Sequence, residues 1–226
     1  MNMENLGKFY IDGAWIAPKS SLAMPVLNPA TELQIGSVAL GDAADVDVAV
    51  AAANRAFVSY SQTSKVDRLV LLHRLMAVTQ SRFEDLAQAM SIEMGAPISM
   101  AREAHADAAV GHLQGFIDAL EKMQERKKLA SGDIQLREAI GVCGLITPWN
   151  WPMNQIALKV IPALATGCTC VLKPSEHTPI SAMIYAEIIH EAGFPAGVFN
   201  LVQGDGPTVG AAMSRHPNVQ MISFTG

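Results

Sequence analysis

The spacing of apolar positions divides the chain into three stretches. Residues 9–40 combine short apolar runs with the turn dipeptides Asp12-Gly13 and Asn28-Pro29, which is typical of hairpins and extended arms. From residue 42 to about residue 123 the apolar positions recur at helical intervals, and after residue 134 short apolar runs alternate with helical segments. The first stretch is therefore expected to wrap a surface as strands.

Three helices are predicted for the second stretch. The first starts near Asp42, with Asp42 or Asp45 available as its N-cap. A longer helix is expected over residues 65–94, where a Gly-Ala-Pro sequence ends it, and an Ala-rich helix is expected over residues 98–123. The charged run over residues 121–128 favours a solvated turn rather than a binding patch.

Strands and helices alternate in the third stretch. The predicted strands cover residues 140–146, 169–172, 198–202 and 221–224, and the predicted helices cover residues 153–165, 180–192 and 208–214. Such alternation indicates a parallel sheet joined by right-handed crossovers. The predicted fold class is α/β: a Rossmann-like parallel sheet with flanking helices, preceded by an N-terminal arm and a helical segment.

Composition and charge narrow the possible functions. The chain is 50% apolar and 16% charged, as expected for a folded globular protein. Its net charge is −5 and its basic residues are scattered, which argues against a nucleic-acid partner. Residues 1–13 hold no continuous apolar run, and Lys159, Pro162 and Gly167 interrupt the most apolar stretch, residues 156–172. We therefore expect a cytoplasmic protein with no secretory signal and no membrane partner.

The cysteines and histidines do not indicate a metal site. The three cysteines, Cys143, Cys168 and Cys170, are an odd number, which argues against a disulfide framework. Cys168 and Cys170 have no second pair to complete a zinc site, and the six histidines are dispersed. No metal is expected. Because free cysteines are commonly buried as small hydrophobes, that interpretation is favoured for all three over a nucleophilic role.

Ligands of open parallel sheets bind beyond the carboxyl ends of the strands, so the loops there are the candidate site. The first such loop is residues 147–152, in which two prolines and two tryptophans flank Asn150. The amide of Asn150 could donate N–H bonds to a developing oxyanion. Alternatively, Asn150 could cap the helix that starts near Pro152, since Asn is a favoured N-cap residue.

The next two loops suggest a nucleotide. Glu176 follows the second strand of the alternating half, the position at which an acidic residue binds the adenosine ribose in dinucleotide folds. Lys173 could bind the same ribose or a 2'-phosphate, although the two residues could instead form a surface ion pair. Residues 204–210 form a glycine cluster that suits a pyrophosphate. Its spacing has one residue more than G-x-G-x-x-G before the last glycine, so this motif alone is weak.

Together these motifs resemble the aldehyde dehydrogenase superfamily. The motifs that carry the resemblance are Thr147-Pro148-Trp149-Asn150, Pro162 to Thr169, Leu172 to Glu176 with Thr178-Pro179, and Phe224-Thr225-Gly226. Ile11-Asp12-Gly13, Trp15, Asn28 to Thr31 and Asp45-Val46-Asp47 agree with it in the first half. The motifs are highly specific in this order, and the resemblance covers essentially the whole chain.

The resemblance implies an NAD site, with NADP as a possible cofactor, and a homo-oligomer. Asn150 is similar to the side-chain oxyanion donor of the family. The residues similar to its cofactor-binding positions are Ile146, Thr147, Pro148, Trp149, Lys173, Ser175, Glu176, Gly206, Gly210, Phe224, Thr225 and Gly226. Residues 1–123 are then expected to form the N-terminal arm and helices of the cofactor-binding domain, residues 124–138 an oligomerisation ribbon, and residues 139–226 the Rossmann-like segment.

The resemblance stops short of the whole enzyme. Family members oxidise an aldehyde to a carboxylic acid with hydride transfer to NAD(P), and they use a nucleophilic cysteine and a general-base glutamate that no motif of this chain matches. We therefore expect an aldehyde dehydrogenase-like fold that is truncated, without its catalytic domain, and inactive alone. The alternative is a catalytically inactive nucleotide-binding or interaction module.

The last predicted strand suggests how the chain behaves in solution. Residues 221–224 are apolar, and in the parent fold their neighbours would come from residues beyond Gly226. The ribbon near residues 134–136 would expose a second edge. Because unpaired edges and apolar patches invite pairing, we expect the chain alone to be poorly stable and to associate.

Overall fold

A six-stranded sheet forms the centre of the molecule. The computed structural model describes residues 3–226, so the first two residues of the amino-terminal segment considered above lie outside the described residues. The order of strands across the sheet is β10 (Met221–Phe224), β7 (Val142–Ile146), β8 (Thr169–Lys173), β9 (Phe199–Leu201), β1 (Phe9–Ile11) and β2 (Ala14–Ile16). The first four strands are parallel, whereas β1 pairs antiparallel with both β9 and β2. The α/β prediction with a parallel sheet is confirmed, and the N-terminal arm extends that sheet.

Strands β7 and β8 are buried along their whole length because both faces of the sheet are covered. Alternate residues face two different cores: Cys143 and Leu145 belong to one apolar cluster, and Val142 and Ile146 belong to the other. Since side chains of a strand alternate between faces, a continuous apolar run satisfies both cores at once.

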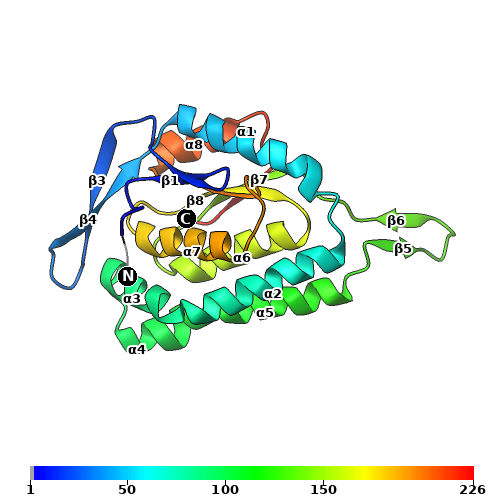
Figure 1. Cartoon of the computed structure of the whole chain (residues 1–226), viewed down its shortest axis with the longest axis horizontal. Coiled ribbons are helices and arrows are strands. Elements are labelled where there is room, and N and C mark those ends of the chain that lie inside the picture. Colours follow the sequence, from blue (N-terminus) through cyan, green and yellow to red (C-terminus); the bar gives the residue numbers. More distant parts are fainter. Residues whose placement is uncertain (1–2) are drawn as a thin grey trace.

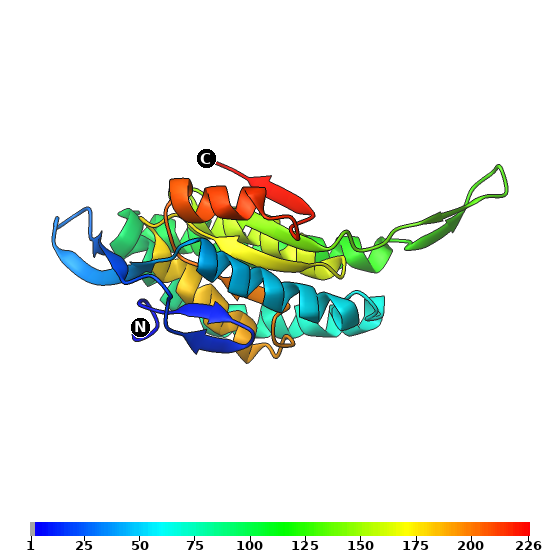
Figure 2. The ribbon, with the colours of Figure 1, turned by 90° about the horizontal axis from the view of Figure 1, so that it is seen from above.

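Helices cover the sheet in layers (Figures 1 and 2). Helices α1 (Ala43–Tyr60) and α8 (Ala211–Arg215) lie on one face, and α6 (Pro152–Ala165) and α7 (Pro179–Glu191) lie on the other. An outer layer packs against α6 and α7 and consists of α2 (Lys65–Ser81), α3 (Phe83–Met94), α4 (Ile98–Met100), the π-helical η1 (Ala101–Ala106) and α5 (Asp107–Lys122). The prediction of flanking helices is confirmed.

Both residues proposed as the N-cap of the first helix take part in its cap. Asp42 is the N-cap residue, and its carboxylate accepts from the main-chain N–H groups of Ala44 at 2.8 Å and Asp45 at 3.2 Å. The Asp45 carboxylate accepts in return from the N–H of Asp42 at 3.1 Å and also from that of Lys19 at 2.7 Å. This reciprocal capping box leaves fewer unpaired N–H groups at the start of α1.

The single helix predicted over residues 65–94 is wrong, because the chain forms two helices that meet at Arg82. The backbone of Arg82 leaves the helical region, with φ −101° and ψ 13°. Its guanidinium binds Asp85 at 2.6 Å, Glu187 at 3.0 Å and Glu191 at 2.6 Å. Two of these partners lie on α7, so the contacts that accompany the break are distant in the sequence and invisible to helical periodicity.

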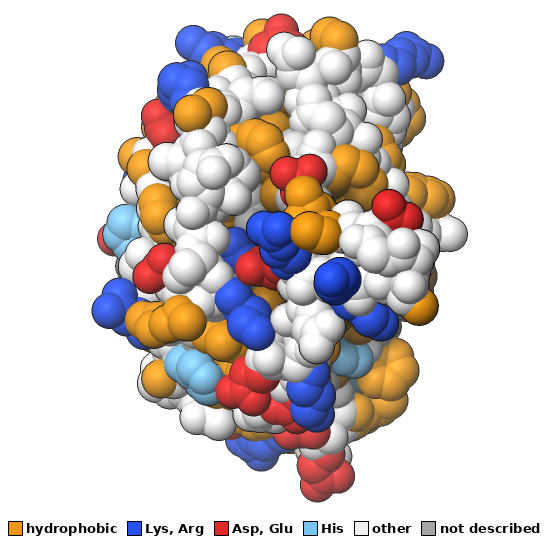
Figure 3. Space-filling model, turned by 90° about the vertical axis from the view of Figure 1, so that its right-hand side faces the viewer, with side chains coloured by type: hydrophobic (Ala, Val, Ile, Leu, Met, Phe, Trp, Pro, Cys, Tyr) orange, Lys and Arg blue, Asp and Glu red, His pale blue; other side chains and the backbone are white. Residues whose placement is uncertain are grey.

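Two hairpins extend from this core. Strands β3 (Leu22–Leu27) and β4 (Gln34–Leu40) form one, and β5 (Arg126–Lys128) and β6 (Ile134–Leu136) form the ribbon that projects on the right of Figure 1. All six strand residues of the ribbon are exposed. Figure 3 looks at this end of the molecule and shows Lys and Arg side chains mixed with Asp and Glu. Residues 121–128 are mostly exposed, as predicted, but they form the end of α5 and strand β5 rather than a turn.

Strand β10 lies at the end of the sheet, opposite the β1–β2 hairpin. It pairs with β7 along one side, and the Phe224 side chain is 66% exposed. Because an open strand edge and an exposed aromatic ring favour association, the 226-residue chain is expected to self-associate at micromolar concentration. Light scattering on the purified chain tests this prediction, and a monodisperse monomer would contradict it.

The buried Arg68 yields a prediction about stability. Its side chain is 4% exposed, its Nε donates to the carbonyl of Ala165 at 2.9 Å, and its guanidinium pairs with Glu125. Arg68→Met leaves the buried carbonyl of Ala165 without its donor and the carboxylate of Glu125 without its partner. The substitution should therefore lower the free energy of unfolding by about 3 kcal/mol. Urea titration measures this. The matched control is Arg55→Met, which removes an ion pair with Asp12 whose arginine is 63% exposed and should cost less than about 1 kcal/mol.

Candidate active site

The carboxyl ends of the four parallel strands lie at one edge of the sheet, and main-chain hydrogen bonds tie their loops together. The N–H of Thr147 donates to the carbonyl of Lys173 at 3.2 Å, and the N–H of Thr225 donates to that of Ile146 at 3.1 Å. The N–H of Val202 donates to the carbonyl of Leu172 at 3.0 Å. The loops predicted from the sequence are therefore held as neighbours.

The first loop, residues 147–152, contains Asn150, the candidate oxyanion donor. Asn150 is exposed, and among residues 3–226 its amide has no hydrogen-bond partner. The N-cap of α6 is Trp151, which makes no side-chain cap, so the capping alternative for Asn150 is wrong. The hydroxyl of Thr147 is buried and has no partner within the described chain. This loop thus presents polar groups that the fold itself does not use.

The second loop holds a buried lysine beside a carboxylate. The Lys173 side chain is 4% exposed, and its Nζ donates to Glu176 Oε2 at 3.1 Å and to the carbonyl of Pro174 at 3.0 Å. Glu176 is 22% exposed. Ser175 is buried and its Oγ accepts from the N–H of His177 at 3.3 Å. The ion pair allowed for above exists, but its lysine is buried, so it is not a pair on the open surface.

The third loop explains the unusual glycine spacing. Residues Gly206–Gly210 form the π-helical segment η2, in which the N–H of Gly210 donates to the carbonyl of Asp205 at 3.1 Å, five residues back. A π turn takes up one residue more than an α turn, which accounts for the extra residue. The Asp205 carboxylate caps the segment, accepting from the N–H of Thr208 at 2.7 Å.

Gly210 marks the point at which three loops approach one another. A Cβ at Gly210 would lie 3.9 Å from Ile146 Cδ1 and 3.9 Å from Lys173 Cδ. At Gly206 a Cβ would meet no atom within 4 Å, so the main chain there faces open space. Phe224 and Gly226, which follow the edge strand, are exposed, and Thr225 is half-buried. The structure therefore brings Ile146, Lys173 and Gly210 together and leaves space beside Gly206.

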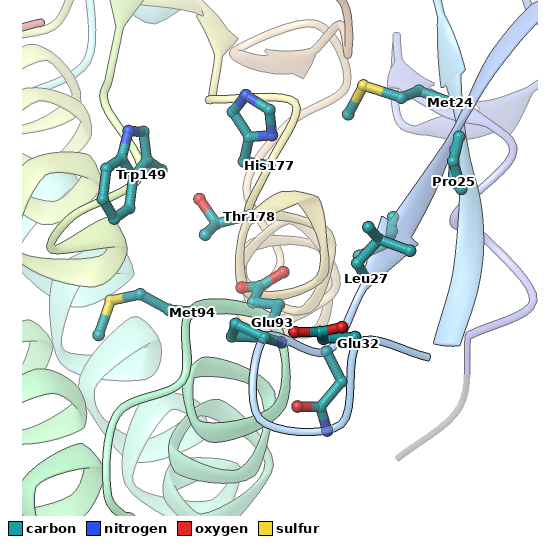
Figure 4. A pocket seen from close by; sticks show the side chains of 12 residues that line it. Met24, Pro25, Leu27, Glu32, Glu93, Met94, Trp149, His177 and Thr178 are labelled. Carbon is teal, nitrogen blue, oxygen red and sulfur yellow. The ribbon is translucent and has the colours of Figure 1, made fainter. Parts of the chain in front are cut away.

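A groove of about 870 Å³ runs beside the first two loops (Figure 4). Trp149 and Met94 line one side, and residues of the β3–β4 hairpin line the other. Glu93 lies at its base and is buried, and its carboxylate accepts from the N–H groups of Ile180 at 2.6 Å and Ser181 at 2.9 Å. The groove and the role of Glu93 escape sequence reasoning, because Glu93 caps α7 from a distant helix and no local motif records that contact.

The described part of the chain contains no group of three or more histidine, cysteine or acidic side chains that could hold a metal ion. Within residues 3–226, no helix has both the length and the apolar character that crossing a bilayer requires.

Comparison with known proteins identifies the family. The model of the "Aldehyde dehydrogenase family" matches residues 15–226. The chain belongs to this family. It is 49% identical to the 3-succinoylsemialdehyde-pyridine dehydrogenase of Pseudomonas sp over 99% of this chain and 47% of that protein. The chain thus spans about half the length of the curated aldehyde dehydrogenase relatives that it matches.

Solved aldehyde dehydrogenases share the fold. The enzyme of Bartonella henselae superposes with a TM-score of 0.95 at 47% identity, over 97% of this chain and 47% of that one. A mutant of aldehyde dehydrogenase C of Pseudomonas syringae, solved with NAD+ and octanal, gives a TM-score of 0.95 at 50% identity over 98% of this chain and 45% of that one. The resemblance inferred from the motifs is confirmed at the level of family and fold.

Glu93 makes stability depend on pH in this aldehyde dehydrogenase chain. Burial raises the pKa of Glu93 to about 7, against the lowering effect of its two main-chain hydrogen bonds. Between the unfolded value of 4.5 and about 7 the folded state therefore binds more protons, so the free energy of unfolding falls as pH rises through this window, by on the order of 3 kcal/mol.

Glu93→Gln should remove this slope, which urea titrations at pH 5, 6, 7 and 8 would measure. The control is Glu138→Gln, which changes an exposed glutamate of the ribbon region and should keep the original slope. Equal slopes in the unchanged chain and in Glu93→Gln would contradict the assignment.

Proposed function

We propose that this chain forms the NAD-binding part of an aldehyde dehydrogenase whose complete reaction oxidises an aldehyde to a carboxylic acid. The observation that carries the proposal is the convergence of Lys173, Ile146 and Gly210 beside an open space at the carboxyl edge of a parallel sheet. Dinucleotides bind at this edge in open α/β folds. The P. syringae relative, solved with NAD+, supports the same ligand here.

Lys173 and Glu176 hold the adenosine ribose in this proposal. The carboxylate of Glu176 accepts hydrogen bonds from the ribose hydroxyls, and the buried ammonium of Lys173, 3.1 Å from that carboxylate, fixes its position and donates to the ribose. The charge of Glu176 repels a 2'-phosphate. The cofactor is therefore NAD in preference to NADP.

The remaining cofactor residues shape the space around the dinucleotide. Gly206 and Gly210 allow the main chain to approach it closely, since no side chain fills the space beside Gly206. The hydroxyl of Thr147, which has no partner within residues 3–226, supplies a hydrogen bond to the dinucleotide. The other residues that contact the dinucleotide in this proposal are Ile146, Pro148, Trp149, Ser175, Phe224, Thr225 and Gly226.

Asn150 is the residue of this chain that acts on the substrate. Its exposed amide, free of protein partners within residues 3–226, donates an N–H bond to the oxyanion that forms when a nucleophile attacks the aldehyde carbonyl. Bound NAD supplies the hydride acceptor. The cysteines of this chain do not serve as the nucleophile, because Cys143, Cys168 and Cys170 are buried near the amino ends of β7 and β8, away from Asn150.

The β5–β6 ribbon is the proposed contact between subunits of a homo-oligomer. Its exposed strand residues include Ile134 and Leu136, which are 48% and 58% exposed and offer both apolar surface and unpaired strand edges. Exposed edges of this kind pair readily with another chain.

Calorimetric titration of the 226-residue chain with NAD and NADP tests the proposal. NAD should bind more tightly than NADP. Glu176→Gln should weaken NAD binding by about 10-fold or more, because a charge-assisted hydrogen bond contributes roughly 1.5–3 kcal/mol. The same substitution should narrow the difference between the affinities for NAD and NADP. Glu138→Gln, an exposed glutamate outside the site, is the matched control and should leave both affinities unchanged.

An aldehyde oxidation assay on the same samples completes the test. The expected result is nucleotide binding without NADH formation. Asn150→Ala should leave the NAD affinity within about twofold, because this amide acts on the oxyanion rather than on the cofactor. Absence of NAD binding by a chain that shows the expected helical circular dichroism would refute the proposed function. Cysteine-dependent NADH formation would refute the statement that none of the three cysteines of this chain serves as the nucleophile.

A further inference from the structure

The three cysteines of the chain gather at one place in the fold. Cys143 of β7 and Cys170 of β8 are partners in the parallel register, and Cys168 directly precedes β8. All three side chains are buried and free. The side chains of Cys143 and Cys168 lie close enough for each to shift the pKa of the other. Two neighbouring thiols are an arrangement that a role as separate small hydrophobes does not require.

Cys143 and Cys168 also line a cavity of about 220 Å³, whereas Cys170 does not. The cavity also contains Lys159, whose Nζ donates to Ser223 Oγ at 3.0 Å. Its rim carries the exposed apolar side chains of Ile140, Leu158 and Met221. A small polar molecule therefore has space beside Cys143 and Cys168 and not beside Cys170.

The surroundings of Cys168 favour a thiolate. The neighbouring Cys143 thiol, the hydroxyl of Thr166 at 3.6 Å from its sulfur and the main chain at Ile140 and Gly141 together lower the pKa of Cys168 despite its burial. The neighbouring Cys168 side chain and burial raise the pKa of Cys143. One sulfur of the pair is thus prepared to attack and the other retains its proton.

We propose that Cys143 and Cys168 form a redox-active dithiol that a hydroperoxide, such as hydrogen peroxide, oxidises to an intramolecular disulfide. The Cys168 thiolate attacks one peroxide oxygen and the O–O bond breaks. The departing oxygen takes up a proton and leaves as water, and Cys168 becomes a sulfenic acid. Cys143 then loses its proton and attacks the Cys168 sulfur, so that the S–S bond forms and the S–O bond breaks. Hydroxide leaves with that proton as a second water. Overall, two thiols are oxidised and one hydrogen peroxide is reduced to two waters.

The disulfide would close a covalent loop around the candidate active site. The segment between the two cysteines contains the whole of α6 (Pro152–Ala165) and the loop that presents Asn150. Closing this loop restricts the unfolded chain, so oxidation should raise the midpoint of thermal unfolding. This modification site does not depend on the proposed function, because it needs neither NAD nor an aldehyde.

The test is peroxide treatment of the reduced, folded 226-residue chain, followed by alkylation of the remaining thiols and peptide mapping without reduction. We expect a peptide that joins Cys143 to Cys168 and an increase in the midpoint of thermal unfolding that a reductant reverses. In Cys170→Ala, peroxide treatment should reduce the number of thiols that can be alkylated from two to none. Cys143→Ala and Cys168→Ala are the matched controls, each of which should form no intramolecular disulfide.

Three results would overturn the proposal. The first is a Cys168–Cys170 disulfide in the unsubstituted chain, and the second is a sulfinic acid on Cys168 with Cys143 still free. The third is a disulfide between two chains in place of the internal one. The peptide map of the unsubstituted chain decides between these results even if a variant fails to fold. Circular dichroism before oxidation verifies that this chain has its native helices. The same treatment in guanidinium should lose the preference for Cys143–Cys168, because that preference comes from the folded geometry.

Discussion

Strands β7 and β8 have no solvent-facing side, and the need to bury both of their faces determines how the rest of the chain is arranged. Apolar side chains of these strands alternate between two cores, with Leu145 in one and Ile146 in the other. Helices must therefore lie on both faces, and each connection from strand to strand must cross over one face. Parallel strands follow from those crossovers, and parallel strands place all their carboxyl ends at one edge.

The loops at that edge inherit their geometry from the same constraint. Because main-chain hydrogen bonds continue past the strand ends, as from Thr147 to Lys173 and from Thr225 to Ile146, the loops are positioned by the sheet itself. The fold leaves a small set of polar groups there unpaired, including the hydroxyl of Thr147. A buried polar group without a partner costs free energy, so such groups are expected where a ligand provides the missing bonds.

Sequence reasoning succeeded where local pattern and core burial agree. The strand over residues 221–224 was predicted to the residue, and the other strands of the alternating half differ from the structure only at their ends. It failed where distant contacts decide the local structure. The break at Arg82 is accompanied by ion pairs to α7, and the cap on α7 comes from Glu93 on another helix. The motifs named the loops at the carboxyl edge of the sheet, but the π turn that brings Gly210 close to Ile146 could not be seen in glycine spacing alone.

The place of β1 in the sheet constrains the order in which the chain can fold during synthesis. Tyr10 of β1 pairs with Leu201 of β9, and the N–H of Asp12 donates to Asn200 Oδ1 at 3.0 Å across a sequence separation of 188 residues. The β1–β2 hairpin leaves the ribosome well before β9, so it cannot join the central sheet until almost all the described chain has been made. The β7–β8 pair can form much earlier, because its strands are close in sequence. Helix α1 can cover Phe9 and Ile11 early, because they share an apolar cluster with its residues. Tyr10 has to wait for α7 and β9, which carry its ring partners His190 and Phe199. A strand that is synthesised early is therefore secured late.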